Sequence, residues 1–181
     1  REVADEVGLG VISGGRTRTA DIDGDGRSDL MLFPTSRKEA IAPLLWRNLA
    51  DSENPVGFRF EPITNSGLPR MMFGDIVVFA DLDNDGIKDA IITRYLDYLQ
   101  DNYLEPVDAP IRTGWMRGDG TGRFSDPQLL AAALPATTAA IAVGDVNLDG
   151  LPDLWIGNWY EKYFTGVEAF SNDLLLQHGS G

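Results

Sequence analysis

The stretch Asp21-Ile22-Asp23-Gly24-Asp25-Gly26-Arg27-Ser28-Asp29 returns twice in this chain, at 81–89 and at 145–153. Every copy carries Asp or Asn at its first, third, fifth and ninth positions and Gly at its sixth, and an apolar run follows. The first positions of successive copies are 60 and 64 residues apart. Recurrence at a period of this length is the signature of a repeat architecture. The sequence therefore predicts three copies of one structural unit.

The spacing of the oxygen-bearing side chains within each copy indicates calcium. Calcium takes about six to eight oxygen ligands, and alternating acidic residues with a Gly at the turn let a short loop direct several carboxylates to one point. The backbone carbonyl of the seventh position can add a further ligand. We predict up to three calcium ions, one per loop, each of which pins the turn between two strands. The predicted ligands are Asp21, Asp23, Asp25, Arg27 and Asp29 in the first loop, Asp81, Asp83, Asp85, Ile87 and Asp89 in the second, and Asp145, Asn147, Asp149, Leu151 and Asp153 in the third.

Other metal sites fit these loops less well. An EF-hand needs Glu at the twelfth position, where the three copies have Leu32, Ile92 and Ile156. Magnesium prefers fewer carboxylates and more waters, and transition metals prefer imidazole or thiolate. Ordinary Asp, Asn and Gly turns remain an alternative for any single loop, but three matching loops favour a cation, because crowded carboxylates otherwise repel one another. We expect the third loop, which has Asn147 in place of a carboxylate, to bind calcium most weakly.

The formal net charge of −13 is concentrated in the loops. Eleven of the 28 acidic residues stand at predicted ligand positions, and the other 17 nearly balance the 15 Lys and Arg. We predict no nucleic-acid partner, because such partners attract basic patches. The apolar stretches, such as 129–134, are too short to span a bilayer, so no direct membrane insertion is predicted. Without Cys, the chain has neither a disulfide framework nor a thiol nucleophile.

Strand patterns divide each unit into short antiparallel strands, so the chain is predicted to be all-β. In the second unit, Val, Ile, Phe and Thr dominate the strands on either side of the loop, as in the middle of a stacked sheet. The glycines within 117–122 predict a hairpin between the third and fourth strands. The predicted strands are 16–20, 30–33, 44–48 and 57–61 in the first unit, 74–80, 89–95, 112–117 and 123–125 in the second, and 138–144, 154–159 and 174–178 in the third.

Three features together resemble the FG-GAP or VCBS repeat found in integrin α-subunit propellers and many bacterial exported proteins. They are Phe73-Gly74-Asp75 ahead of the second loop, the Asp-x-Asp-x-Asp-Gly-x-x-Asp loops themselves, and the apolar strand after each loop. The segments 45–48 and 115–124 are similar to the hairpin of the bacterial ASPIC/UnbV subgroup, which is related to cartilage acidic protein. Phe-Gly is absent ahead of the first and third loops. The resemblance implies a β-propeller with calcium in its blade loops and an extracytoplasmic location.

On this basis each unit is one blade of four antiparallel strands. Blade 1 is predicted over 1–66 with calcium loop 21–29, blade 2 over 67–133 with loop 81–89, and an incomplete blade 3 over 134–181 with loop 145–153. Propellers need about four to eight blades, so we expect about three blades of a larger propeller, completed by missing sequence or by other chains. We favour missing sequence.

No catalytic residue is predicted, because His178 is the only His and no Cys is present. We favour a non-enzymatic protein-interaction or assembly module, whose partner is another protein or further blades. The contact surface would be the long connections between the second and third strands, at 34–43, 96–111 and 160–173. A carbohydrate-binding propeller, based on Trp115, Trp159 and the tyrosines of these connections, is the alternative. An enzyme whose catalytic residues lie outside this chain is the second alternative.

Overall fold

The structure is a computed structural model that describes residues 1–10, 15–33, 41–71, 75–93, 113–134, 136–159 and 170–178. These residues form strands and turns, with no helix among them. None of the described segments therefore forms the long apolar helix that a membrane crossing would need. The strands are β1 (Thr17–Ala20), β2 (Asp29–Leu32), β3 (Leu44–Ala50), β4 (Phe58–Pro62), β5 (Ile76–Ala80), β6 (Asp89–Thr93), β7 (Gly114–Met116), β8 (Gln128–Leu129), β9 (Thr138–Gly144), β10 (Asp153–Asn158) and β11 (Asp173–Leu175).

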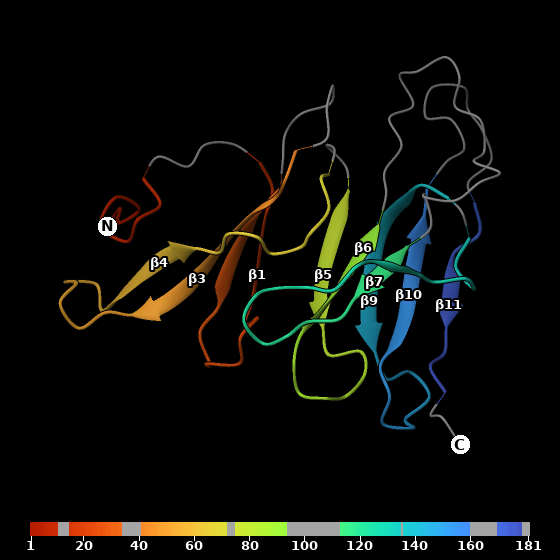
Figure 1. The fold of residues 1–181 in the computed structure, drawn as a ribbon. Coiled ribbons are helices and arrows are strands. Elements are labelled where there is room, and N and C mark those ends of the chain that lie inside the picture. Colours follow the sequence, from red (N-terminus) through yellow and green to blue (C-terminus); the bar gives the residue numbers. More distant parts are fainter. Residues whose placement is uncertain are drawn as a thin grey trace, which may run out of the picture.

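The strands form three antiparallel sheets, each built from neighbours in the sequence. The first sheet has the order β1-β2-β3-β4, the second β5-β6-β7-β8, and the third, in its described residues, β11-β10-β9. The sheets stand side by side in chain order (Figure 1). Successive antiparallel sheets that pack face to face are the blades of a β-propeller. The predicted all-β fold of propeller blades is therefore confirmed.

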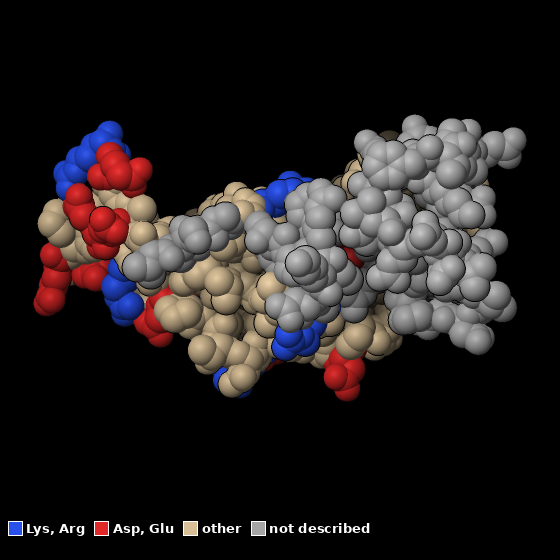
Figure 2. Space-filling view, turned by 90° about the horizontal axis from the view of Figure 1, so that it is seen from above, with Lys and Arg blue, Asp and Glu red and all other residues tan. Residues whose placement is uncertain are grey.

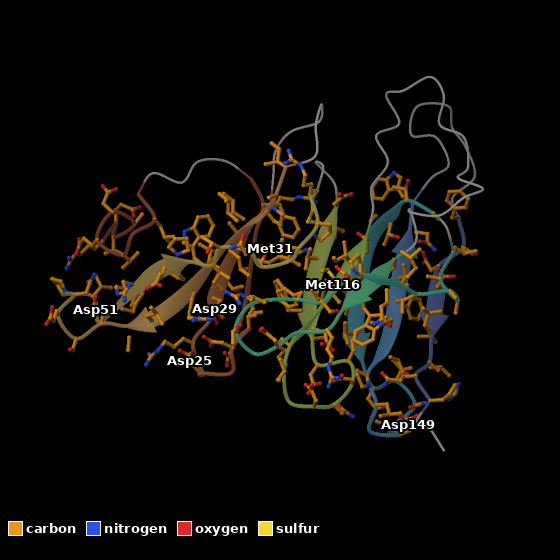
Figure 3. The ribbon with its side chains drawn as sticks, viewed as in Figure 1. Asp25, Asp29, Met31, Asp51, Met116 and Asp149 are labelled. Atoms are coloured by element: carbon orange, nitrogen blue, oxygen red, sulfur yellow. The ribbon has the colours of Figure 1, made fainter. Side chains whose placement is uncertain are left out.

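Two apolar cores lie between the sheets. The first core joins the first and second sheets, and Figure 3 shows two of its members, Met31 and Met116, between them. The second core joins the second and third sheets and includes Leu154. Strand β6 serves both cores, since Ile92 belongs to the first and Ile91 to the second. The apolar run after the second loop is thus buried on both faces, as its composition predicts.

The fourth strand of the second sheet differs from the prediction. The sequence predicts a strand at 123–125, whereas β8 lies farther along the chain and pairs with β7. Within the predicted span only Phe124 forms a bridge, opposite Gly118. The Ser125 N–H donates across the hairpin to the Arg117 carbonyl at 2.8 Å, while the Phe124 N–H points the other way and donates to the Ser66 carbonyl, also at 2.8 Å. The predicted hairpin is therefore present, but its outer arm is bonded to the segment that enters the blade, and regular pairing starts only after it.

A glycine allows the chain to enter the second blade close to this hairpin. Gly67 has a φ of +81°, and a Cβ on it would lie 2.4 Å from the Phe124 carbonyl oxygen. The first blade repeats the contact, because the Phe60 N–H donates to the Val7 carbonyl at 2.8 Å and the next residue, Gly8, has a φ of +86°. The segment that leads into each of these two blades is thus fastened to the outer side of that blade.

Gly67→Ala is expected to lower the free energy of unfolding by about 2–3 kcal/mol, because a left-handed conformation and a new steric clash both oppose the added methyl group. Gly57→Ala is the matched control. Gly57 has a φ of +87°, but nothing lies within 4 Å of an added Cβ, so only the conformational cost of about 1 kcal/mol applies. Urea unfolding of the three proteins measures both losses. Equal losses would show that the close approach to Phe124 adds no cost.

Candidate metal centres in the loops

The three acidic loops lie on the same side of the molecule, each between the first and second strands of its sheet (Figure 1). Figure 3 places Asp25 and Asp149 at the loop tips and Asp29 where β2 begins. The opposite side of the molecule, seen in Figure 2, carries its visible acidic side chains mainly at the end formed by the first sheet and the N-terminal residues. The loops therefore place their carboxylates along one rim.

The sixth-position glycine turns each loop back onto its first aspartate. Gly86 has a φ of +88°, and its N–H donates to Asp81 Oδ2 at 2.9 Å. Glycine adopts this conformation without the penalty that a Cβ brings. The equivalent hydrogen bonds join Gly26 to Asp21 at 3.0 Å and Gly150 to Asp145 at 2.8 Å. The same tight turn is therefore built three times.

The ninth-position aspartate of each loop is buried and fastens the loop to a backbone N–H within the third strand of its sheet or two residues beyond that strand. Asp89 is 0% exposed, and its Oδ2 accepts the Leu82 N–H at 3.0 Å while its Oδ1 accepts the Gly118 N–H at 2.9 Å. We call this arrangement the carboxylate clamp. The other two clamps are Asp29 with the N–H groups of Ile22 and Asn48, and Asp153 with those of Val146 and Gln177. The ligand prediction missed this role, although an Asp at the start of a buried strand signals a need for partners.

Burial governs the protonation of the clamp carboxylates in the first two loops. It raises the pKa of Asp29 and of Asp89, although the two accepted N–H groups at each carboxylate oppose the shift. Neighbouring carboxylates at the third and fifth positions raise the pKa of both further. In the third loop, the N–H donors of Gln177 and Val146 instead lower the pKa of Asp153. A divalent cation beside Asp29 or Asp89 would favour the ionised carboxylate.

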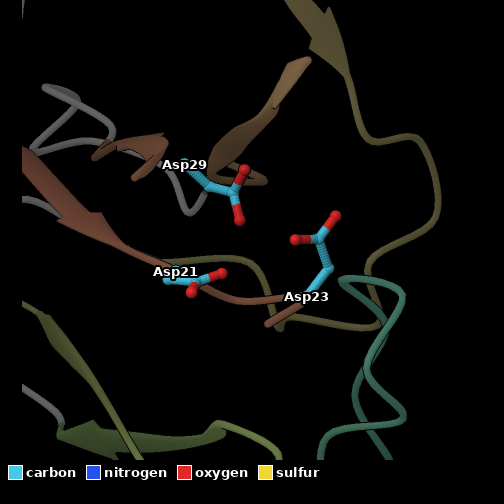
Figure 4. A group of neighbouring side chains, drawn as sticks. All are labelled: Asp21, Asp23 and Asp29. Carbon is cyan, nitrogen blue, oxygen red and sulfur yellow. The ribbon is translucent and has the colours of Figure 1, made fainter. Parts of the chain in front are cut away.

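Three carboxylates converge in each of the first two loops, with one oxygen of each lying within 4.8 Å of the others. The first triad is Asp21, Asp23 and Asp29, and the second triad is Asp81, Asp83 and Asp89. Figure 4 shows the first triad around a common space. Asp21 Oδ1 is buried and has no hydrogen-bond partner among the described residues, so a cation there would satisfy it. Because every potential metal ligand in the triads is a carboxylate oxygen, both triads can hold a hard divalent cation.

The fifth-position aspartates lie outside both triads. Asp85 Oδ1 accepts the Ile87 N–H at 2.9 Å, and Asp25 Oδ1 accepts the Arg27 N–H at 2.8 Å. Each bond closes a turn within the loop. Coordination by these two carboxylates, and by the carbonyls of the two seventh-position residues, stays a prediction.

The third loop forms no triad within the part of the chain that the structure describes. Asp149 Oδ1 accepts the Leu151 N–H at 2.9 Å, as in the other loops. The Asn147 side-chain amide donates to Asp149 Oδ2 at 2.9 Å. Asp145 and Asp153 are held by the turn and by the clamp. The five predicted ligands of this loop, and its weaker calcium binding, stay predictions.

Two arginines reach the first two loops, Arg47 from within β3 and Arg117 from the residue just after β7. Arg117 Nε lies 3.0 Å from Asp83 Oδ2, and its Nη2 lies 2.7 Å from Asp85 Oδ2. The hydrogen bond from Arg117 lowers the pKa of Asp85. Arg47 has the same place in the first sheet, with its Nε 2.8 Å from Asp23 Oδ2. Both arginines directly precede a residue that donates to a clamp, a position that only the sheet register reveals.

A comparison with known protein families supports the repeat that the three loops indicate. A family model of FG-GAP-like repeats matches residues 21–92 and 99–156, which together make up more than half of the chain and include every acidic loop. No curated protein matches the chain.

Proposed function

The chain belongs to the FG-GAP-like repeat family, and from this membership we propose that it is a calcium-stabilised, extracytoplasmic propeller module that assembles with another protein or with further blades. Calcium is the proposed ion because the two triads offer only carboxylate oxygens. The extracytoplasmic location is proposed because FG-GAP-like repeats are typical of extracellular proteins. The hairpin segments 45–48 and 115–124 support the ASPIC/UnbV subgroup as part of the same proposal.

The proposed assembly role rests on an exposed apolar face of the third sheet. Along β10, Leu154 and Ile156 are buried, whereas Trp155 between them is 51% exposed. Its cross-strand neighbours are Leu174, which is 46% exposed, and Ala142, which is also exposed. We call Ala142, Trp155 and Leu174 the open face. A contiguous apolar patch on a sheet is typical of a surface that another protein element covers.

The burial of the equivalent position in the second sheet supports one kind of occupant for the open face. Ile91 is the second residue after its clamp aspartate Asp89, as Trp155 is after Asp153. Ile91 is 0% exposed, because it lies in the core beneath the third sheet. Trp155 on the third sheet is thus exposed, whereas the equivalent residue of the second sheet, Ile91, is buried against the third sheet. The occupant that fits the open face is the apolar face of a further blade-like sheet.

Trp155→Glu is expected to weaken association through the open face by at least about tenfold, because a central Trp contributes about 2 kcal/mol or more to a protein contact. Light scattering over a concentration series measures this as self-association, in which a second copy of the chain supplies the apolar sheet. Leu129→Glu is the matched control, since it adds the same charge to a β8 residue that is 46% exposed. Equal weakening by both variants would contradict the proposal, and a wild-type chain that stays monomeric at every concentration would exclude a second copy of the chain as the occupant.

Carbohydrate binding has no comparable support. Trp115 lines a cavity of about 350 Å³ between the second and third sheets, with Asp83 and Gln177 as its polar members and mostly aliphatic residues elsewhere. Sugar hydroxyl groups need hydrogen-bond partners. The tyrosines of the long connections lie outside the described residues. The carbohydrate and enzyme alternatives therefore stay predictions, and neither is advanced as a function.

A further inference from the structure

Both carboxylate oxygens of Asp85 are engaged away from the second triad. Its Oδ1 accepts the Ile87 N–H at 2.9 Å, and its Oδ2 accepts a hydrogen bond from Arg117 Nη2 at 2.7 Å. The same guanidinium contacts Asp83, a member of the triad, through its Nε. The second loop thus carries four aspartates at predicted ligand positions, and two of them, Asp83 and Asp85, are paired with the same arginine.

We propose that Arg117 is a positioning residue that holds Asp85 away from a cation in the second triad and thereby lowers the calcium affinity of this loop. The inference rests on the calcium in the proposed function and assigns a residue that sets its affinity. Calcium affinity depends on how many charged ligands a loop supplies. Arg117 occupies one such carboxylate, and its positive charge also lies close to a second, where it repels a cation.

The geometry allows Arg117 to act on Asp85 without holding the fold together. Its side chain is 54% exposed, so it lies over the loop and outside the core. The Asp89 clamp fastens the same loop through backbone N–H groups, independently of the guanidinium. Removal of the arginine should therefore release Asp85 while the turn and the other triad members stay in place.

The third loop has neither the arginine nor the fourth carboxylate. In its sheet, the residue just before the clamp donor is Leu176. The third position of the loop is Asn147, whose amide donates to Asp149 Oδ2, the oxygen that corresponds to the one Arg117 occupies on Asp85. The second loop thus has one carboxylate more than the third, which has Asn147 at the equivalent position. The arginine accompanies the additional carboxylate.

Arg117→Gln is expected to tighten calcium binding at the second loop on the order of tenfold, because it returns a charged ligand to the site. Isothermal titration of the whole chain with calcium chloride measures the dissociation constant, in an Asp23→Asn background that weakens the first triad. Arg123→Gln is the matched control. It removes the same charge from the same hairpin, and Arg123 makes no ion pair with the second loop in the described part of the chain.

Two further measurements distinguish positioning from structural support. In an Asp85→Asn background, Arg117→Gln should tighten binding much less, because no carboxylate at position 85 is left to release and only the repulsion beside Asp83 is removed. In chelator, Arg117→Gln should melt slightly below the wild type, since an ion pair is lost. Calcium affinity and the stability of the calcium-free chain should therefore change in opposite directions, whereas a purely structural arginine would lower both.

Unchanged or weaker calcium binding by Arg117→Gln would overturn the inference, as would a gain that Arg123→Gln reproduces or that persists in full in the Asp85→Asn background. These outcomes would leave the proposed calcium-stabilised module intact. Failure of the Asp23→Asn parent and of the wild type to bind calcium would instead overturn the proposed role of calcium, and this inference with it.

Discussion

Asp89→Ala is expected to lower the free energy of unfolding by about 3–5 kcal/mol in the presence of a chelator. The carboxylate is fully buried and accepts the backbone N–H groups of Leu82 and Gly118. A hydrogen bond to a charged acceptor contributes about 1.5–3 kcal/mol, and a buried donor without a partner costs about 1–3 kcal/mol. The truncation leaves both donors without an acceptor. Urea unfolding with excess chelator measures the loss without any contribution from a bound cation.

Asp85→Ala is the matched control for the clamp, since it removes the same side chain from an exposed position of the same loop. Its ion pair with Arg117 is solvated, and such pairs contribute little to stability. Asp89→Asn keeps one acceptor oxygen but turns an amide N–H toward the other backbone donor, so its loss should lie between those of the two alanine variants. If Asp89→Ala cost no more than Asp85→Ala, the clamp would not be a source of stability.

The strands beside the loops could be predicted because their burial leaves a clear pattern. Strands β2 and β6 begin at Asp29 and Asp89, the ninth positions of their loops. An apolar run directly after a tight turn indicates a strand covered on both faces. Strand β8 has only two residues and cannot show a period-two pattern. Its place depends on the hydrogen bond from Phe124 to Ser66, a contact between distant segments that no local pattern contains.

The residue types of the candidate site could be predicted from the sequence. The separate roles of its aspartates, in the triad, in the clamp or in the ion pair, could not. The donors to the Asp89 clamp are backbone N–H groups, which every residue except Pro possesses, so nothing in the sequence marks Gly118 as a partner. The separation of Asp85 from the second triad depends on Arg117, which is 32 positions away and reaches the loop through the pairing of β6 with β7. Spacing therefore indicates a cation, while sheet register decides which carboxylates are available to it.

Calcium is expected to raise the melting temperature by about 10–20 °C relative to chelator. A ligand at a hundred times its dissociation constant stabilises a protein by about 2.7 kcal/mol per site, so the two triads together would contribute about 5 kcal/mol. For a chain of 181 residues, each kcal/mol corresponds to about 2–4 °C. Differential scanning calorimetry with calcium, with chelator and with magnesium measures the shift. Magnesium should give a smaller rise, because it retains its waters and demands a stricter geometry.

Asp83→Asn distinguishes the contribution of cation binding at the second triad from the contribution of the turn itself. It removes a charged ligand from the second triad but leaves the Asp89 clamp intact, so it should abolish about half of the calcium-induced rise with little change in chelator. Asp126→Asn, which removes the same charge from an exposed residue outside the loops, should leave the rise unchanged. A melting temperature that is the same with calcium and after its complete removal would mean that the loops are turns held by their clamps and arginines alone, and that their carboxylates have no structural need of a cation.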